Sequence, residues 1–88
     1  MLYIENQWTS GKGKPFKSMN PLTGEIVWEG NFANTSQLNA AMHAAHNSHD
    51  EWSTESIQAR IKIIRKFYAL LEENKLPMTK LISTETGK

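Results

Sequence analysis

Histidine and aspartate side chains gather near the middle of the chain, and they are the residues best suited to bind a metal. The group comprises His43, His46, His49 and Asp50. On a helix, His43 and His46 lie three residues apart and could chelate weakly, whereas His49 is rotated by about 120° from His43. A zinc site needs three or four ligands that converge on one point. We therefore predict solvated or core-edge histidines rather than a metal site.

The stretch Gly11-Lys12-Gly13-Lys14 invites comparison with a phosphate-binding loop. That motif requires G-x-x-x-x-G-K followed by Ser or Thr, and it opens a helix. Here Pro15 and Phe16 follow instead and lead into an extended segment. We predict a plain, flexible loop over residues 11–15.

Basic residues cluster in the second half of the chain, at Arg60, Lys62, Arg65 and Lys66. The last three share the polar face of a predicted helix. The formal net charge is only +1, from 10 Lys and Arg against 9 Asp and Glu. Such a balance gives no strong attraction to nucleic acid, so we predict a solvated helix face and no nucleic-acid partner.

Arg60 differs from its basic neighbours because it falls within the apolar arc of the same helix, beside Ile64 and Phe67. A charge in such a place needs a partner. We predict that Arg60 pairs with Glu85 or binds the free carbonyl groups at a helix end.

Large aromatic residues concentrate in the first third of the chain, at Trp8, Phe16, Trp28 and Phe32. They could form a surface on which a ligand stacks. Large aromatic side chains mostly serve burial, so we predict instead that they pack against parts of a larger protein.

Length and composition bound the fold and the location. A chain of 88 residues is one small domain or a piece of a larger one, and its stability alone is marginal. It has no cysteine, which fits a reducing compartment. No basic region precedes an apolar run at the N-terminus, and no stretch reaches the ~18 apolar residues of a membrane span. We expect a cytoplasmic protein without a membrane partner, so the sequon Asn34-Thr35-Ser36 carries little weight.

Residues 1–33 predict two antiparallel β-hairpins. Asn6 tolerates the left-handed conformation, so a tight turn at Glu5 and Asn6 joins the strands of the first hairpin. The second hairpin joins residues 16–19 to residues 25–29 through Pro21-Leu22-Thr23-Gly24. In that turn Gly24 supplies a positive φ at low cost.

Residues 34–88 predict helices, the first of them capped by Thr35 or Ser36. Apolar residues recur along it within about a 100° stripe. They are Leu38, Ala41, Met42, Ala45, His49 and Trp52, with histidine counted among them.

Ser56 is predicted to cap a second helix that runs to about Glu73. Its apolar side covers roughly half the circumference, which implies burial on two sides. Pro77 suits the first turn of a short third helix, and Gly87 is a natural C-terminal cap. The fold class is therefore α+β, with two antiparallel hairpins, two long helices and a short third. We expect such a chain by itself to expose apolar surface and to associate or to be partly disordered.

Five groups of residues, spread over the whole chain, stand out by their order and spacing. They are Tyr3-Ile4-x-x-x-Trp8; Asn20-Pro21-x-Thr23-Gly24-Glu25-Ile26; Ala41-x-x-Ala44-Ala45 with Trp52 and Arg60; Leu70-Leu71-Glu72-Glu73-Asn74-Lys75; and Glu85-Thr86-Gly87-Lys88. Together they resemble the N-terminal segment of the NAD-dependent aldehyde dehydrogenase superfamily. Within it, Glu25-Ile26-Val27-Trp28-Glu29-Gly30-Asn31 resembles the succinylglutamate-semialdehyde dehydrogenases of arginine breakdown.

The resemblance implies an α/β parent subunit in which a Cys thiolate attacks an aldehyde and hydride passes to NAD. Residues 1–88 would be its opening segment, without the catalytic and main cofactor-binding parts. We expect no catalytic and no cofactor-binding residue here, no bound NAD and no activity. The chain ends directly after Gly87-Lys88, so we expect a truncated subunit. Its partner would be the rest of that subunit, and the parent is expected to be a homo-oligomer.

One site of the family carries over in part. In some relatives the backbone carbonyls just before the Asn-Pro pair bind a monovalent cation, and the resemblance implies that Ser18 and Met19 are the matching residues here. Three other interpretations stay open: another aldehyde dehydrogenase subfamily, a standalone interaction module, and a small helical nucleic-acid binder.

Overall fold

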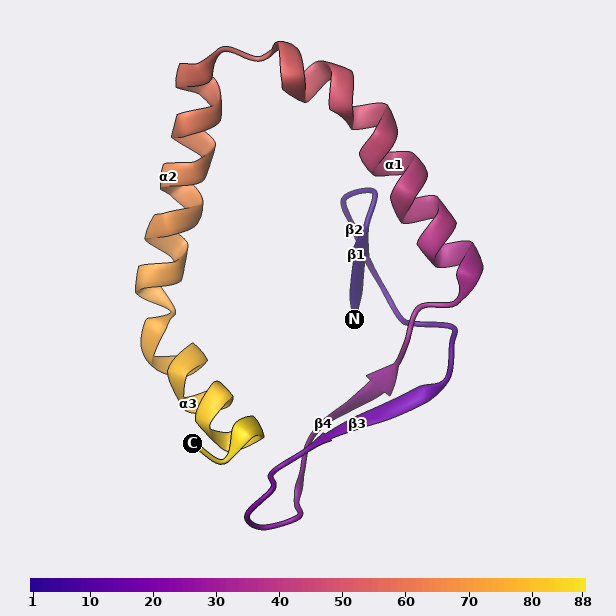
Figure 1. Ribbon diagram of the computed structural model, residues 1–88, viewed down its shortest axis with the longest axis vertical. Helices are drawn as coiled ribbons and strands as arrows, with labels where there is room; N and C mark the ends of the chain where they lie inside the picture. The colour runs from indigo at the N-terminus through magenta and orange to yellow at the C-terminus, as the bar shows by residue number, and fades with distance from the viewer.

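The computed structural model describes residues 1–88 as two β-hairpins followed by three helices (Figure 1). The strands are β1 (Leu2–Ile4), β2 (Gln7–Thr9), β3 (Pro15–Met19) and β4 (Ile26–Asn31), and the helices are α1 (Thr35–Thr54), α2 (Ile57–Glu73) and α3 (Lys75–Thr86). Each sheet is a separate antiparallel pair, β1 with β2 and β3 with β4. The predicted α+β arrangement of two hairpins, two long helices and a short third is confirmed.

Turn residues fix both hairpins where the sequence predicts. Glu5 and Asn6 have φ values of 51° and 61°, which is the left-handed pair that a tight two-residue hairpin turn needs. In the second hairpin, Gly24 has φ +75°, and Asn20 Oδ1 accepts the backbone N–H of Leu22 at 2.9 Å. The register shifts between Ser18 and Met19, which pair with Trp28 and Ile26, so Val27 is left unpaired and β4 carries the bulge.

The caps agree with the sequence at two helices and differ at the first. Ser56 Oγ accepts the backbone N–H of Ala59, as predicted for α2, and Gly87 ends α3 in the left-handed conformation. At α1 the prediction of Thr35 or Ser36 is wrong. Asn34 is the cap, and it forms a capping box with Gln37.

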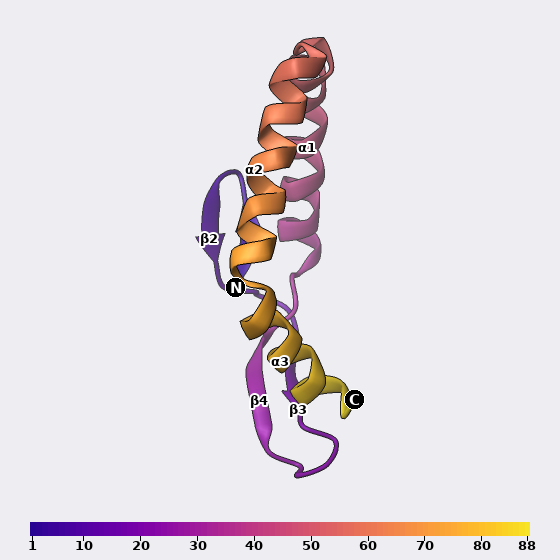
Figure 2. The same ribbon diagram turned by 90° about the vertical axis from the view of Figure 1, so that its left-hand side faces the viewer.

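The elements follow one another around an open ring (Figure 1). The β1–β2 hairpin lies inside it against α1, and α3 returns towards the β3–β4 hairpin. Seen from the side, the ring is thin (Figure 2), in keeping with its extents of 49 × 34 × 17 Å. Ser18 Oγ donates a hydrogen bond to Glu85 Oε2 and so links β3 to the end of α3.

No apolar side chain is buried, and Gly11 and Gln37 are the two buried residues. The accessible surface is 7764 Å². A compact monomer of 10.0 kDa would expose about 5,200 Å². The predicted exposure of the second helix is confirmed, because Ile61, Ile64 and Phe67 are 42%, 58% and 58% exposed.

Candidate functional site

The histidine group does not form a metal site. His43, His46 and His49 lie exposed on α1, and no three His, Cys, Asp or Glu side chains converge on a point that could hold a metal ion. Their spacing along α1 spreads the imidazole groups around the helix, which is the geometric reason.

The glycine-rich stretch is a loop over residues 11–14, as predicted, and β3 begins at Pro15, but the loop is held in place by backbone contacts. Gly13 N–H donates to Phe32 O at 2.7 Å, and Phe32 N–H donates to Lys14 O at 2.9 Å. A Cβ at Gly11 or Gly13 would collide with backbone carbonyl oxygens of residues 31–33. The two glycines therefore allow two segments of backbone to cross in contact.

Gln37 is the polar residue that sequence reasoning missed. It is 9% exposed. Its side chain connects α1 to residues 10–14, the loop between β2 and β3, which we call the crossing segment. Oε1 accepts the N–H of Lys12 at 2.8 Å and that of Asn34 at 3.2 Å, while Nε2 donates to Ser10 O at 2.9 Å. The signal was present as Asn34-x-x-Gln37, the spacing of a capping box.

Arg60 does not pair with Glu85, so that part of the prediction is wrong. Glu85 lies at the other end of the helical half and accepts from Ser18 instead. The chain contains one ion pair, Lys17 Nζ with Glu29 Oε2 at 3.7 Å on the second hairpin. Arg60 Nε is buried and has no hydrogen-bond partner at all, so capture of helix-end carbonyls through Nε is also absent.

The other basic residues lie on the surface. Lys62, Arg65 and Lys66 are all exposed on α2, as a solvated helix face requires. No helix of the chain is both long and apolar enough to cross a membrane.

Three of the aromatic residues pack on one another. Phe16 stacks on Phe32 with ring centroids 4.3 Å apart and meets Trp28 at 4.9 Å. Trp28 also lies over Gly30, where a Cβ would collide with its ring. In the first hairpin Trp8 packs on Tyr3 at 5.0 Å. The outer faces stay exposed, and burial against a larger protein stays a prediction.

Two motifs far apart in the sequence meet where the end of α3 reaches the β3–β4 hairpin. A Cβ on Gly87 would approach Pro21 Cγ at 2.9 Å, so the end of α3 touches the turn of the second hairpin. Ser18, beside the bulge, contacts Glu85 from the same motif as Gly87. The Asn-Pro-x-Thr-Gly turn and the Glu-Thr-Gly-Lys end of the chain therefore form one corner of the molecule.

Comparison with known sequences decides the family. The sequence profile of the aldehyde dehydrogenase family matches residues 8–88. The chain belongs to the aldehyde dehydrogenase family. The resemblance to its N-terminal segment, drawn from the motifs above, is confirmed.

Similar curated proteins carry one name. N-succinylglutamate 5-semialdehyde dehydrogenases of Acinetobacter baylyi and Salmonella schwarzengrund are each 41% identical over 87 residues. The Salmonella typhimurium protein of the same name is 40% identical over 87 residues. These alignments cover 99% of this aldehyde dehydrogenase chain but 18% of each relative. The chain thus spans less than a fifth of the length of the dehydrogenases it matches.

Proposed function

We propose that this chain is the N-terminal segment of an NAD(P)-dependent dehydrogenase that oxidises succinylglutamate semialdehyde to succinylglutamate in arginine breakdown. The observation that carries the proposal is 41% identity across 99% of the chain to relatives named for that aldehyde. The Trp28-x-Gly30 pair supports it further, because it stands in the stretch that resembles that subfamily.

We also propose that residues 1–88 contribute structure rather than chemistry to the parent. In this division of labour, the hairpins of residues 1–33 and the helices of residues 34–88 build one edge of the subunit. The catalytic thiol and the main cofactor-binding parts belong to the remainder, and the free chain has no activity. The lack of any buried apolar side chain supports this role, because such a chain offers its apolar faces to other elements.

Ser18 and Met19 are proposed as backbone ligands of a monovalent cation in the parent. The bulge at Val27 of β4, opposite these two residues, supports this assignment, since a bulge disrupts the ladder locally. Hard cations accept such carbonyl oxygens as ligands. A thermal-shift comparison of the parent in potassium, sodium and choline chloride tests it. A melting temperature equal in all three salts would reject the site.

The proposed function is tested on the native polypeptide, recovered from its source with an antibody to residues 1–88. We expect a mass several times 10.0 kDa and NAD(P) reduction with succinylglutamate semialdehyde. Preference for another aldehyde by more than about tenfold in kcat/KM, which is about 1.4 kcal/mol, would assign another subfamily. A native mass of 10.0 kDa would reject the enzyme segment and favour an interaction module.

A further inference from the structure

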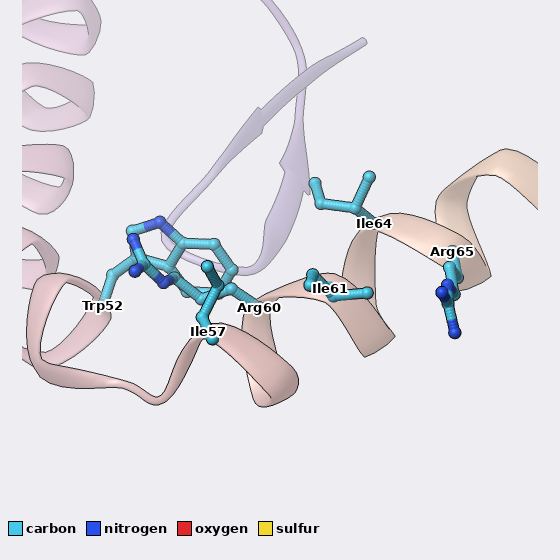
Figure 3. A pocket seen from close by; sticks show the side chains of 6 residues that line it. All are labelled: Trp52, Ile57, Arg60, Ile61, Ile64 and Arg65. Atoms are coloured by element: carbon cyan, nitrogen blue, oxygen red, sulfur yellow. The ribbon is translucent and has the colours of Figure 1, made fainter.

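An open hollow lies at the corner where α1 turns into α2 (Figure 3). Its lining residues are Trp52, Ile57, Arg60, Ile61, Ile64 and Arg65. The four apolar members are between 41% and 59% exposed, so residues 1–88 leave a large part of each uncovered. The hollow is therefore apolar with a cationic side, and the two arginines provide that side.

The two arginines differ in their state. Arg65 is exposed and reaches water, whereas Arg60 Nε is buried without an acceptor. It is the one buried side-chain nitrogen or oxygen in the chain without a partner. Folded proteins satisfy buried polar groups almost without exception. Arg60 is partly exposed, but its Nε–H has no acceptor within residues 1–88, so the position is suited to an acceptor from outside them.

The area left exposed indicates how large the missing neighbour is. The chain exposes 7764 Å², about 2,500 Å² more than the roughly 5,200 Å² of a compact protein of its mass. One partner in a standard protein–protein interface loses only about 800 Å². An excess of this size fits a segment enclosed by its own subunit better than a surface for a separate protein.

We propose that an apolar element from the remainder of the dehydrogenase subunit fills this hollow and presents an Asp or Glu carboxylate to Arg60. This inference rests on the function proposed above. The relatives supply the source of the element, because the chain spans 18% of their length. The guanidinium selects a carboxylate because its planar fork matches two carboxylate oxygens and because a charge in an apolar setting needs an opposite charge.

The test is a chimera in which this chain replaces the matching 87 residues of the Acinetobacter baylyi dehydrogenase, which is 41% identical there. Arg60→Met should lower the melting temperature by about 5 °C or more. Arg65→Met is the matched control, since it removes an exposed arginine from the same hollow, and it should shift the melting temperature by no more than about 1 °C. A crystal structure should place a carboxylate oxygen within about 4 Å of the Arg60 guanidinium.

The carboxylate is then tested directly. Changing that Asp to Asn, or that Glu to Gln, should reproduce the loss caused by Arg60→Met. The double variant should lose little more than either single variant, because both remove the same interaction. Equal melting temperatures for Arg60→Met and Arg65→Met, or an Arg60 that meets only backbone carbonyls, would overturn the inference.

Failure of the inference and failure of the proposed function give different results. An active chimera whose melting temperature is unchanged by Arg60→Met rejects only the proposed carboxylate partner. A larger native polypeptide that oxidises no succinylglutamate semialdehyde rejects only the proposed substrate. If the chimera does not fold, the chain is supplied separately to the Acinetobacter baylyi protein lacking its matching segment. Failure to assemble there as well rejects both.

Discussion

At the residue scale, Gln37 links separate segments of the chain through hydrogen bonds to their backbone groups. Its amide joins Ser10, Lys12 and Asn34 while remaining 9% exposed. Removing it leaves backbone groups of two segments without partners. Each such group costs about 1–3 kcal/mol when it is kept from water.

We predict that Gln37→Ala loosens the crossing segment locally. In the chimera, hydrogen exchange at the amides of Lys12 and Gly13 should accelerate at least about tenfold, which corresponds to about 1.4 kcal/mol. Gln58→Ala is the control because Gln58 is exposed on α2 and makes no side-chain hydrogen bond. Unchanged exchange in Gln37→Ala would show that the glycine crossing holds itself.

Gly30 is a second residue with a single steric role. We predict that Gly30→Ala displaces the ring of Trp28 and destabilises the second hairpin by about 1–3 kcal/mol. Near-ultraviolet circular dichroism and tryptophan fluorescence report the displacement. Gly24→Ala separates backbone strain from collision, since Gly24 has φ +75° and open space around it. Identical tryptophan spectra for wild type and Gly30→Ala would contradict the steric account.

At the element scale, helix α1 begins at the position that lets Gln37 reach the crossing segment, residues 10–14. Asn34, Thr35 and Ser36 all suit a cap, so local preference alone does not choose among them. The choice falls on Asn34 because this register places Gln37 over Ser10 and Lys12. A helix starting one or two residues later would lose the capping box and the hydrogen bonds of Gln37 to Ser10 and Lys12.

We predict that Asn34→Ala costs about 1 kcal/mol, the usual value for losing a side-chain cap. Thr35→Ala should change the free energy of unfolding by less than about 0.5 kcal/mol, as for an ordinary exposed position. Urea unfolding of the chimera, followed by hydrogen exchange in the first turn of α1, compares the two. A larger loss in Thr35→Ala would place the cap where the sequence alone suggested.

At the scale of the whole molecule, the chain forms an open ring without a core. Its helices carry the apolar residues that a core would need, but α1 and α2 diverge from a common corner (Figure 1). A closed fold would require each apolar face to find a second element, and within residues 1–88 no element buries the apolar side chains of α2.

We predict that the isolated chain associates with itself or is partly disordered. Sedimentation should show species heavier than 10.0 kDa that grow with concentration, and dyes that bind apolar surface should fluoresce. Ile64→Lys with Phe67→Lys should reduce association, because both side chains are 58% exposed on α2. Lys62→Gln on the polar face is the control. A monomer with sharp, dispersed NMR signals would contradict the prediction.

The sequence by itself determined what depends on a residue and its near neighbours. The turns at Glu5-Asn6 and Gly24, the Ser56 cap and the Gly87 end follow from each residue's own backbone preferences or from partners within four positions. Family membership was readable for the same reason, because it rests on short motifs in order.

Only the tertiary structure decided what brings distant segments together. The contact of Gly11 and Gly13 with residues 31–33, the burial of Gln37 and the separation of Arg60 from Glu85 all depend on chain crossings that no local pattern encodes. Arg60 illustrates the physical reason. Its place in an apolar arc required a partner, but which group could reach it depended on the path of α2 and α3, and that path leads Glu85 to Ser18.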